Sequence, residues 1–208
     1  MSNFSESTEQ NDSYLTLAGK SEGIYKELGS KFLYFGFPVQ SEENIKSELA
    51  ALRKTYFDAS HHCYAWVLGK ESLQFRANDD GEPNHSAGDP ILGQIRSHQL
   101  SNTLIVVVRY FGGTKLGVSG LIKAYKSAAA LAIEENQIIR EWVKTTLELR
   151  FPYPAMNEVM KVVKSHELEI GSQEMQLDCK MTLTFREGLK AQVLEKLEEI
   201  EGLLIKSD

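Results

Sequence analysis

Residues 78–89 form an acidic turn, which gathers carboxylates and a histidine that could do acid–base or metal chemistry. The candidate residues are Asp79, Asp80, Glu82 and His85. Carboxylate oxygens are ligands for hard cations such as Mg²⁺, and carboxylates held close together take up protons at different pH values. The same residue types favour a tight turn at Asp80-Gly81, and Asp89 is suited to cap a following helix. Three interpretations are open: a structural turn with a ligand-contact surface, a metal site, or a catalytic site. We predict the first, with no metal and no cofactor.

Residues 109–120 form a glycine-rich segment that follows a β-branched run and leads into a helix. Its predicted anion-binding residues, with one from that helix, are Arg109, Tyr110, Gly112, Gly113, Lys115, Gly117, Ser119 and Lys123. Backbone N–H groups at such a helix start favour anions, and glycines let a phosphate approach the backbone closely. The spacing is near that of a Walker A loop, but Val118 stands where lysine is required, so we exclude a P-loop ATPase. The other interpretation is a turn that lets the helix pack tightly on a sheet.

The charge of the chain is distributed unevenly. Its 208 residues carry a formal net charge of −6, which argues against a protein that simply coats nucleic acid, and 42% of them are hydrophobic, as in ordinary globular proteins. From Pro90 to Ile133, however, there is no Asp or Glu, and the basic residues there are Arg96, Arg109, Lys115, Lys123 and Lys126. An acid-free basic stretch beside an acidic one is expected either from burial or from a recognition surface.

Nucleophilic catalysis has little support in the sequence. His61 and His62 begin a predicted strand, so their side chains point to opposite faces and cannot bind one metal together. The two cysteines, Cys63 and Cys179, lie far apart, and a Gly-x-Ser-x-Gly elbow is absent. This cysteine usage fits a reducing cytoplasm, and the polar start of the chain differs from a secretory signal. Because no apolar stretch reaches the roughly 18 residues that span a membrane, we predict a cytoplasmic protein without a membrane segment.

Hydrophobic periodicity and turn residues predict an α+β domain over residues 19–137, after a disordered tail at residues 1–18. The expected strands are two within residues 23–39 and one each at 61–68, 73–76 and 103–110, and the expected helices are at 41–56, 89–100 and 121–136. Ser41 is suited to cap the first helix and Asp89 the second. The alanine-rich last helix implies close packing against the sheet.

A second pattern predicts a separate domain over residues 142–206. The expected strands are at 145–151, 168–170, 175–185 and 203–205. One helix is expected to begin after Pro152, and a second is expected over residues 189–197. We expect Gly171-Ser172 to join the two middle strands. The order βαββαβ is that of the ferredoxin-like fold, a sheet covered on one face by two helices.

Taken together, the acidic turn and the glycine-rich segment resemble the signature of the IMPACT/YigZ family. The residues that carry this resemblance are Asp79-Asp80-Gly81-Glu82-Pro83, Ala87-Gly88, Pro90-Ile91-Leu92, Val107-Val108-Arg109-Tyr110-Phe111-Gly112-Gly113, Lys115-Leu116-Gly117, Gly120-Leu121 and Ala124-Tyr125. The upstream run His61-His62-Cys63-Tyr64-Ala65 also fits, and the resemblance covers about residues 19–137. The sequence departs from the family pattern at Asn78, where serine is usual, at Asn84-His85-Ser86, at Asp89, which replaces a basic residue, and at Val118-Ser119.

The resemblance implies a ribosomal-protein-S5 domain-2-like fold for the N-terminal domain and a C-terminal domain similar to the last domain of elongation factor G. It also implies a link to translation, because eukaryotic relatives regulate initiation by binding a protein of a stress-kinase pathway, and it transfers no catalytic residue. We predict a non-enzymatic, translation-related regulator that binds RNA, the ribosome or a translation-associated protein. Lys126 would add a phosphate contact, and Tyr110 or Phe111 would stack on bases. The alternative is an enzyme that acts on a small phosphorylated ligand, with the acidic turn as its acid–base or Mg²⁺ site.

Overall fold

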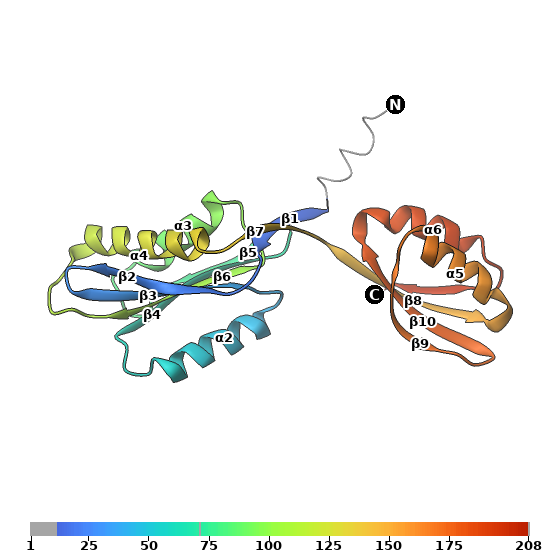
Figure 1. Cartoon of the computed structure of the whole chain (residues 1–208), viewed down its shortest axis with the longest axis horizontal. Coiled ribbons are helices and arrows are strands. Elements are labelled where there is room, and N and C mark those ends of the chain that lie inside the picture. The colour runs from blue at the N-terminus through green and yellow to red at the C-terminus, as the bar shows by residue number, and fades with distance from the viewer. Residues whose placement is uncertain (1–11, 71, 208) are drawn as a thin grey trace, which may run out of the picture. The chain divides into compact units, whose positions relative to one another are not determined.

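The computed structural model of the chain describes residues 12–70 and 72–207 (Figure 1). They fall into two compact units. The first spans Tyr14–Glu141, and the second joins residues 12–13 to the residues from Trp142 onward. None of the helices in these described ranges has the length and apolar character needed to cross a membrane.

The first unit is built on a five-stranded antiparallel sheet. In spatial order its strands are β2 (Ser21–Glu27), β3 (Ser30–Pro38), β6 (Thr103–Tyr110), β4 (His61–Leu68) and β5 (Gln74–Asn78). The β-branched strand β6 lies at the centre and is buried from Thr103 to Arg109, as predicted for a strand covered on both faces. One face carries α2 (Glu42–Thr55), and the other carries α3 (Gly88–Ser97) and α4 (Gly117–Glu134) (Figure 1).

Each face of this sheet has its own apolar core. Ile45, Leu49 and Leu52 of α2 recur at helical spacing and pack against one face. Alternate strand residues such as Cys63 and Val107 face the opposite side, toward α3 and α4. Four alanines of α4 are fully buried there, which lets this helix lie close to the sheet as its composition predicts: Ala124, Ala128, Ala129 and Ala132.

The helix starts agree only in part with the expected ones. Ser41 caps α2 as predicted, because its Oγ accepts a hydrogen bond from Asn44 N–H at 3.2 Å. Helix α4 begins at Gly117 rather than near Leu121, so the end of the glycine-rich segment is helical.

The prediction of a disordered tail is wrong for its described part. Residues 1–11 lie outside the described residues, but β1 (Ser13–Leu17) pairs with β7 (Ile138–Trp142), and neither strand was expected. Asp12 is buried within the second unit, where it accepts two hydrogen bonds of 2.7 Å from the Arg186 guanidinium. Short strands whose partners lie at the far end of a domain carry almost no local signal.

The second unit contains the predicted βαββαβ order. Its elements are β8 (Lys144–Pro152), η1 (Tyr153–Ala155), α5 (Met156–Ser165), β9 (Glu169–Glu174), β10 (Asp178–Arg186), η2 (Glu187–Leu189), α6 (Lys190–Glu198) and β11 (Leu204–Ser207). The strands form an antiparallel sheet in the order β11-β8-β10-β9, and α5 and α6 cover one face (Figure 1). Gly171-Ser172 does not join the middle strands but lies inside β9, because Ser172 N–H donates to Thr182 Oγ1 at 2.6 Å and holds the chain against β10.

Candidate functional site

The acidic turn and the glycine-rich segment meet at one buried ion pair. Arg109 Nη1 lies 2.6 Å from Glu82 Oε1, and the Tyr125 hydroxyl of α4 donates to the same oxygen at 2.7 Å. Ser30 Oγ adds a longer contact of 3.4 Å to Arg109 Nη2. Because Arg109 is 5% exposed and Glu82 is 8% exposed, the pair lies inside the protein. This corrects the predicted surface role of Arg109, whose guanidinium is engaged in the interior and does not face a phosphate.

The local sequence explains why Glu82 points inward. Asp80 and Gly81 both take positive φ angles, 43° and 88°, and Glu82 N–H donates to the Asp79 carbonyl at 2.9 Å. Glycine adopts this left-handed backbone readily, and aspartate tolerates it better than most residues. The predicted bend at Asp80-Gly81 is therefore present, and it directs the next side chain toward β6.

Asp79 caps α3 from outside the helix. Its Oδ1 accepts from the N–H groups of Ala87 and Gly88 at 2.9 and 2.8 Å, and its Oδ2 accepts from His85 N–H at 2.9 Å. A carboxylate at this position also interacts favourably with the helix dipole. Asp89, which was expected to be the cap, lies within the first helical turn, and its Oδ2 is 2.6 Å from His85 Nδ1 on the surface.

Asp80 ties the acidic turn to β4 and α2. Its Oδ2 accepts from His62 N–H at 2.6 Å, and Arg53 Nη2 lies 3.3 Å from its Oδ1. His61 and His62 project to opposite faces, because His61 Nε2 lies 3.9 Å from Glu82 Oε1 whereas His62 is buried on the α2 side. Burial lowers the pKa of His62, against the attraction of the Asp80 carboxylate.

Cys63 belongs to the same buried cluster as Glu82. Its Sγ lies within hydrogen-bond distance of two acceptors for the single S–H, the Asp79 carbonyl oxygen at 3.0 Å and the Tyr125 hydroxyl oxygen at 3.3 Å. Burial raises the pKa of the Cys63 thiol and the pKa of the Tyr125 hydroxyl, because their charged forms would lose hydration. A thiol held in its protonated form is a poor nucleophile. Within the part of the chain that the structure describes, no group of three or more His, Cys, Asp or Glu side chains is arranged to hold a metal ion.

Gly112 is required by packing. A Cβ atom at this position would overlap the backbone of Gly29 and Ser30, in the turn between β2 and β3. Gly112 N–H also donates to Ser30 Oγ at 3.1 Å. Gly113 and Gly117 differ from it, because they take φ angles of 86° and 69°, and a Cβ on either would meet open space among the described residues. Tight packing thus explains Gly112, and left-handed backbone explains the other two glycines.

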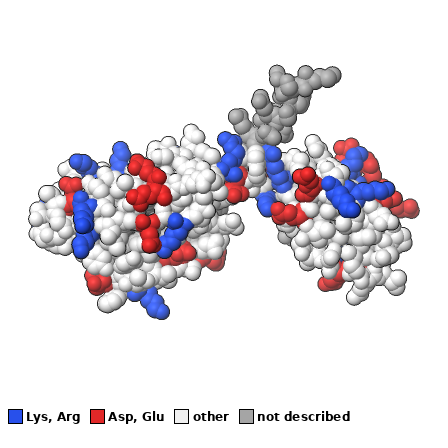
Figure 2. Space-filling view, viewed as in Figure 1, with Lys and Arg blue, Asp and Glu red and all other residues white. Residues whose placement is uncertain are grey.

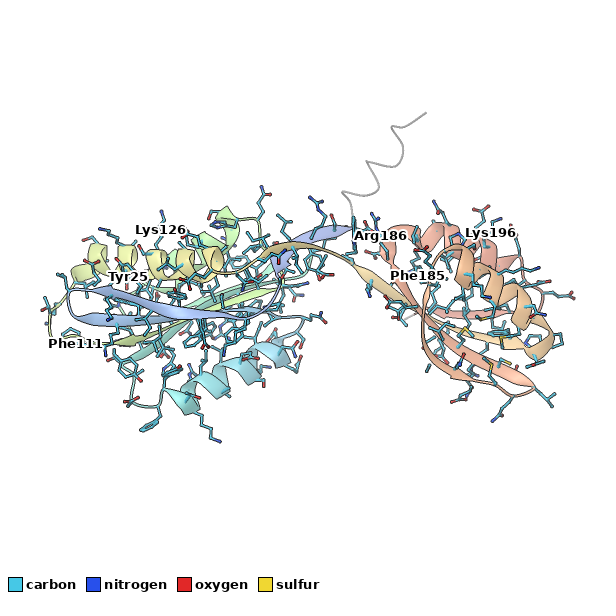
Figure 3. The ribbon with its side chains drawn as sticks, in the orientation of Figure 1. Tyr25, Phe111, Lys126, Phe185, Arg186 and Lys196 are labelled. Carbon is cyan, nitrogen blue, oxygen red and sulfur yellow. The ribbon has the colours of Figure 1, made fainter. Side chains whose placement is uncertain are left out.

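The remaining predicted anion-binding residues lie on the surface. Lys115 is exposed in the loop, and Ser119, Lys123 and Lys126 are exposed on α4. The three α4 residues are spaced four and three positions apart and therefore share one face of the helix. Figure 3 shows Lys126 projecting from the outer side of α4. Figure 2 shows acidic and basic side chains on the same visible face of this unit, so the basic character is local to the segment.

The two aromatic residues at the end of β6 have different surroundings. The Tyr110 hydroxyl donates to Asp58 Oδ1 at 2.7 Å, and this hydrogen bond raises the pKa of Tyr110 to about 12. Phe111 is 51% exposed at one end of the first unit (Figure 3), and the Arg109 guanidinium carbon lies 5.6 Å from its ring centroid. Of the two predicted stacking residues, Phe111 therefore has the accessible ring.

Ser30 and Tyr125 join the buried cluster without having been predicted as site residues. The sequence marks Tyr125 only as part of the family signature, and the structure places it in the core with a hydrogen bond to Glu82. Ser30 contacts Arg109 across 79 positions of sequence, and no short-range pattern marks such a contact.

Comparison with known proteins shows what this chain is similar to. Residues 28–133 match the family described as the Impact N-terminal domain. An "IMPACT family member" of Haemophilus influenzae is 33% identical over 196 residues, which cover 91% of this chain and 94% of that protein. "IMPACT family member YigZ" of Escherichia coli is 36% identical over 126 residues, which cover 60% of this chain and 62% of that protein. One solved structure, described only as a hypothetical protein, has a TM-score of 0.74 at 27% identity and covers 95% of this chain and 98% of its own.

Proposed function

Because the chain belongs to the IMPACT family, we propose that it acts in translation as a non-catalytic protein that binds RNA, free or in the ribosome. The proposed contact surface is the exposed part of the glycine-rich segment together with the outer face of α4. We further assign a ribosomal-protein-S5 domain-2-like fold to the first unit and a ferredoxin-like fold to the second, which its strand order β11-β8-β10-β9 supports. The proposed location is the cytoplasm.

The exposure of three lysines in the acid-free stretch carries this proposal. Arg109 is buried in an ion pair with Glu82, whereas Lys115, Lys123 and Lys126 are exposed. Lysine ammonium groups bind phosphates as point charges and release counterions from RNA when they do so. The surface therefore has the chemistry of backbone contact rather than of base-specific readout.

The carboxylates of the acidic turn are already engaged by groups of the protein, which favours binding over catalysis. Asp79 accepts three backbone hydrogen bonds, Asp80 holds β4 and Arg53, and Glu82 is paired with Arg109. A general base needs a carboxylate oxygen within reach of a substrate proton. These carboxylates hold the fold together, which supports a stable binding surface.

The test is binding of a fluorescently labelled RNA hairpin with single-stranded tails, followed by anisotropy over a series of salt concentrations. The variant replaces three lysines (Lys115→Gln, Lys123→Gln and Lys126→Gln). The control removes the same charge from exposed lysines elsewhere (Lys54→Gln, Lys161→Gln and Lys164→Gln). If each lysine contacts one phosphate, the first variant lowers the slope of log affinity against log salt by about 2–3, and the control leaves it unchanged.

An absence of binding to this RNA and to purified ribosomes at low salt would overturn the proposal. Equal losses in the two triple variants would also contradict it, because they would show an effect of net charge without a site. Ribosome association that survives nuclease treatment and depends on the three lysines would instead indicate a translation-associated protein as partner.

A further inference from the structure

Phe111 is a large apolar side chain that the fold holds on the surface. It is 51% exposed, although it directly follows the buried central strand β6. Leu28, in the turn that packs against Gly112, is also exposed. Single exposed hydrophobic side chains are common on protein surfaces, but an aromatic ring with basic residues beside it has the chemistry of a nucleic-acid stacking surface.

The backbone around Phe111 is fixed on both sides. Phe111 N–H donates to Ser60 Oγ at 3.4 Å, and the next residue, Gly112, packs against Gly29 too closely for any side chain. The Arg109 guanidinium lies 5.6 Å from the Phe111 ring centroid and is itself held by Glu82. A cation at this distance from a ring attracts it, so the interior supports the position of the ring. A ring held in place loses little entropy when a flat ligand stacks on it.

We propose that Phe111 stacks on an unpaired RNA base while Lys115 contacts the adjacent phosphate. This inference rests on the proposed function and narrows its ligand to RNA with single-stranded positions. Lys115 lies four residues after Phe111 in the same exposed loop, and Lys31, which is also exposed, lies beside Tyr110 in the sheet register. These two lysines supply positive charge that suits a phosphate backbone, while the nearby Asp58 carboxylate is engaged by the Tyr110 hydroxyl.

Stacking on an exposed ring selects unpaired bases. In an A-form duplex each base is already stacked and paired, and a side chain on a protein surface meets riboses and phosphates instead. A phenyl ring has no hydrogen-bonding group, so it distinguishes poorly between the four bases. The site therefore recognises unpaired RNA with little preference for its sequence.

The test uses a single-stranded RNA that carries one 2-aminopurine, and the duplex formed from it. The fluorescence of 2-aminopurine falls when the base stacks, so titration with the full chain reports both binding and stacking. We expect tighter binding to the single strand and a fall in fluorescence. Phe111→Leu keeps an apolar side chain but removes the ring face, and it weakens single-strand binding by roughly tenfold.

Two further variants make the result specific. Phe111→Tyr keeps the ring face and retains both affinity and quenching, which separates stacking from a general need for phenylalanine. Phe57→Leu is the matched control, because Phe57 is an exposed phenylalanine of the same unit at 82%, and we expect it to change neither signal. Thermal unfolding of each variant confirms that the fold is kept.

Equal affinity for single strand and duplex, with no effect of Phe111→Leu, would overturn this inference and leave the lysine-dependent binding in place. Loss of affinity in Phe111→Leu without any quenching in the wild type would also overturn it, because it would show an apolar contact other than base stacking. No binding to either RNA would overturn this inference, and the proposed function would then be decided by binding to purified ribosomes.

Discussion

The acidic turn and the glycine-rich segment carry opposite charges and touch at the Glu82–Arg109 pair, but most of their side chains are used differently. In the acidic turn, Asp79, Asp80 and Glu82 are each satisfied by groups of the protein itself. Beyond Gly112, the glycine-rich segment instead keeps Lys115 exposed, and its last residues begin a helix. A run of charge in sequence therefore does not show by itself whether the charge is available to a ligand.

The difference follows from where each segment lies in the sheet. Arg109 is the seventh residue of the central strand β6, which helices cover on both faces, so its charge requires a buried partner. The acidic turn supplies that partner through Glu82. Residues after Tyr110 leave the sheet, and their side chains have no such requirement. The predictions that follow test this contrast between inward and outward charges.

The largest expected effect comes from breaking the buried pair. Arg109→Met removes the cation that pairs with Glu82, and the buried carboxylate keeps its hydrogen bond from Tyr125. We expect the free energy of unfolding to fall by about 3–5 kcal/mol. Urea unfolding followed by circular dichroism measures this change. The double variant Glu82→Gln with Arg109→Met has no unpaired buried charge and recovers part of the loss. A cost below about 1 kcal/mol for the single variant would show that Glu82 turns out to solvent and that the pair is not essential.

Gly112 and Gly113 give the next largest contrast. Gly112→Ala places a methyl group against the backbone of Gly29 and Ser30, and we expect a loss of roughly 2–3 kcal/mol because backbone cannot move aside cheaply. Gly113→Ala meets open space among the described residues and incurs only the left-handed backbone, roughly 1 kcal/mol. Urea unfolding of both variants measures the two losses. Equal losses would contradict the assignment of Gly112 to packing.

Much of the fold follows from local patterns in the sequence. The spacing of Ile45, Leu49 and Leu52 predicts α2, and the β-branched run before Tyr110 predicts the central strand. Strands β1 and β7 were not predicted, because each has five residues and pairs with a segment more than a hundred positions away. Local patterns report which face of an element is apolar, and they do not report which distant segment covers it.

The candidate site was harder to predict than the fold. The sequence marks both charged segments, but the inward direction of Glu82 depends on the φ angles of Asp80 and Gly81. The burial of Arg109 could have been inferred, because a strand buried on both faces leaves no exposed position for it. The capping of α3 by Asp79 could not, because it requires the folded path of the turn between residues 79 and 87.

A smaller effect separates two aspartates at the ends of the acidic turn. Asp79→Ala removes the acceptor for the N–H groups of Ala87 and Gly88, and we expect a loss of about 1–2 kcal/mol in the free energy of unfolding. Asp89→Ala removes only an exposed contact with His85, and we expect a change of less than about 0.5 kcal/mol. Denaturant unfolding at neutral pH measures both. The opposite ranking would restore Asp89 as the cap.

The smallest predicted effect is the pH dependence of stability that His62 contributes. The backbone N–H of His62 donates to Asp80 of the acidic turn. Burial lowers the pKa of His62 below its ordinary value of 6.5, while Asp80 attracts a proton and Arg53 repels it. Well above pH 6.5 the imidazole is neutral in both the folded and unfolded states, and its full contribution to stability is present. As the pH falls through 6.5 toward the lower pKa of the folded state, the unfolded chain takes up the proton first, so this contribution is lost.

The substitution His62→Phe isolates this contribution from those of the other titrating groups. Urea titration at several pH values from 5 to 8 measures the unfolding free energy of the wild type and the variant. As the pH falls, the wild type should lose stability relative to the variant. The movement should stop once the pH lies below the folded-state pKa, because both states then bind the proton. A difference that changes in the opposite direction would mean that the Asp80 carboxylate raises the pKa of His62 more than burial lowers it. The charge of the acidic turn would then affect its neighbours even though its carboxylates are hydrogen-bonded within the protein.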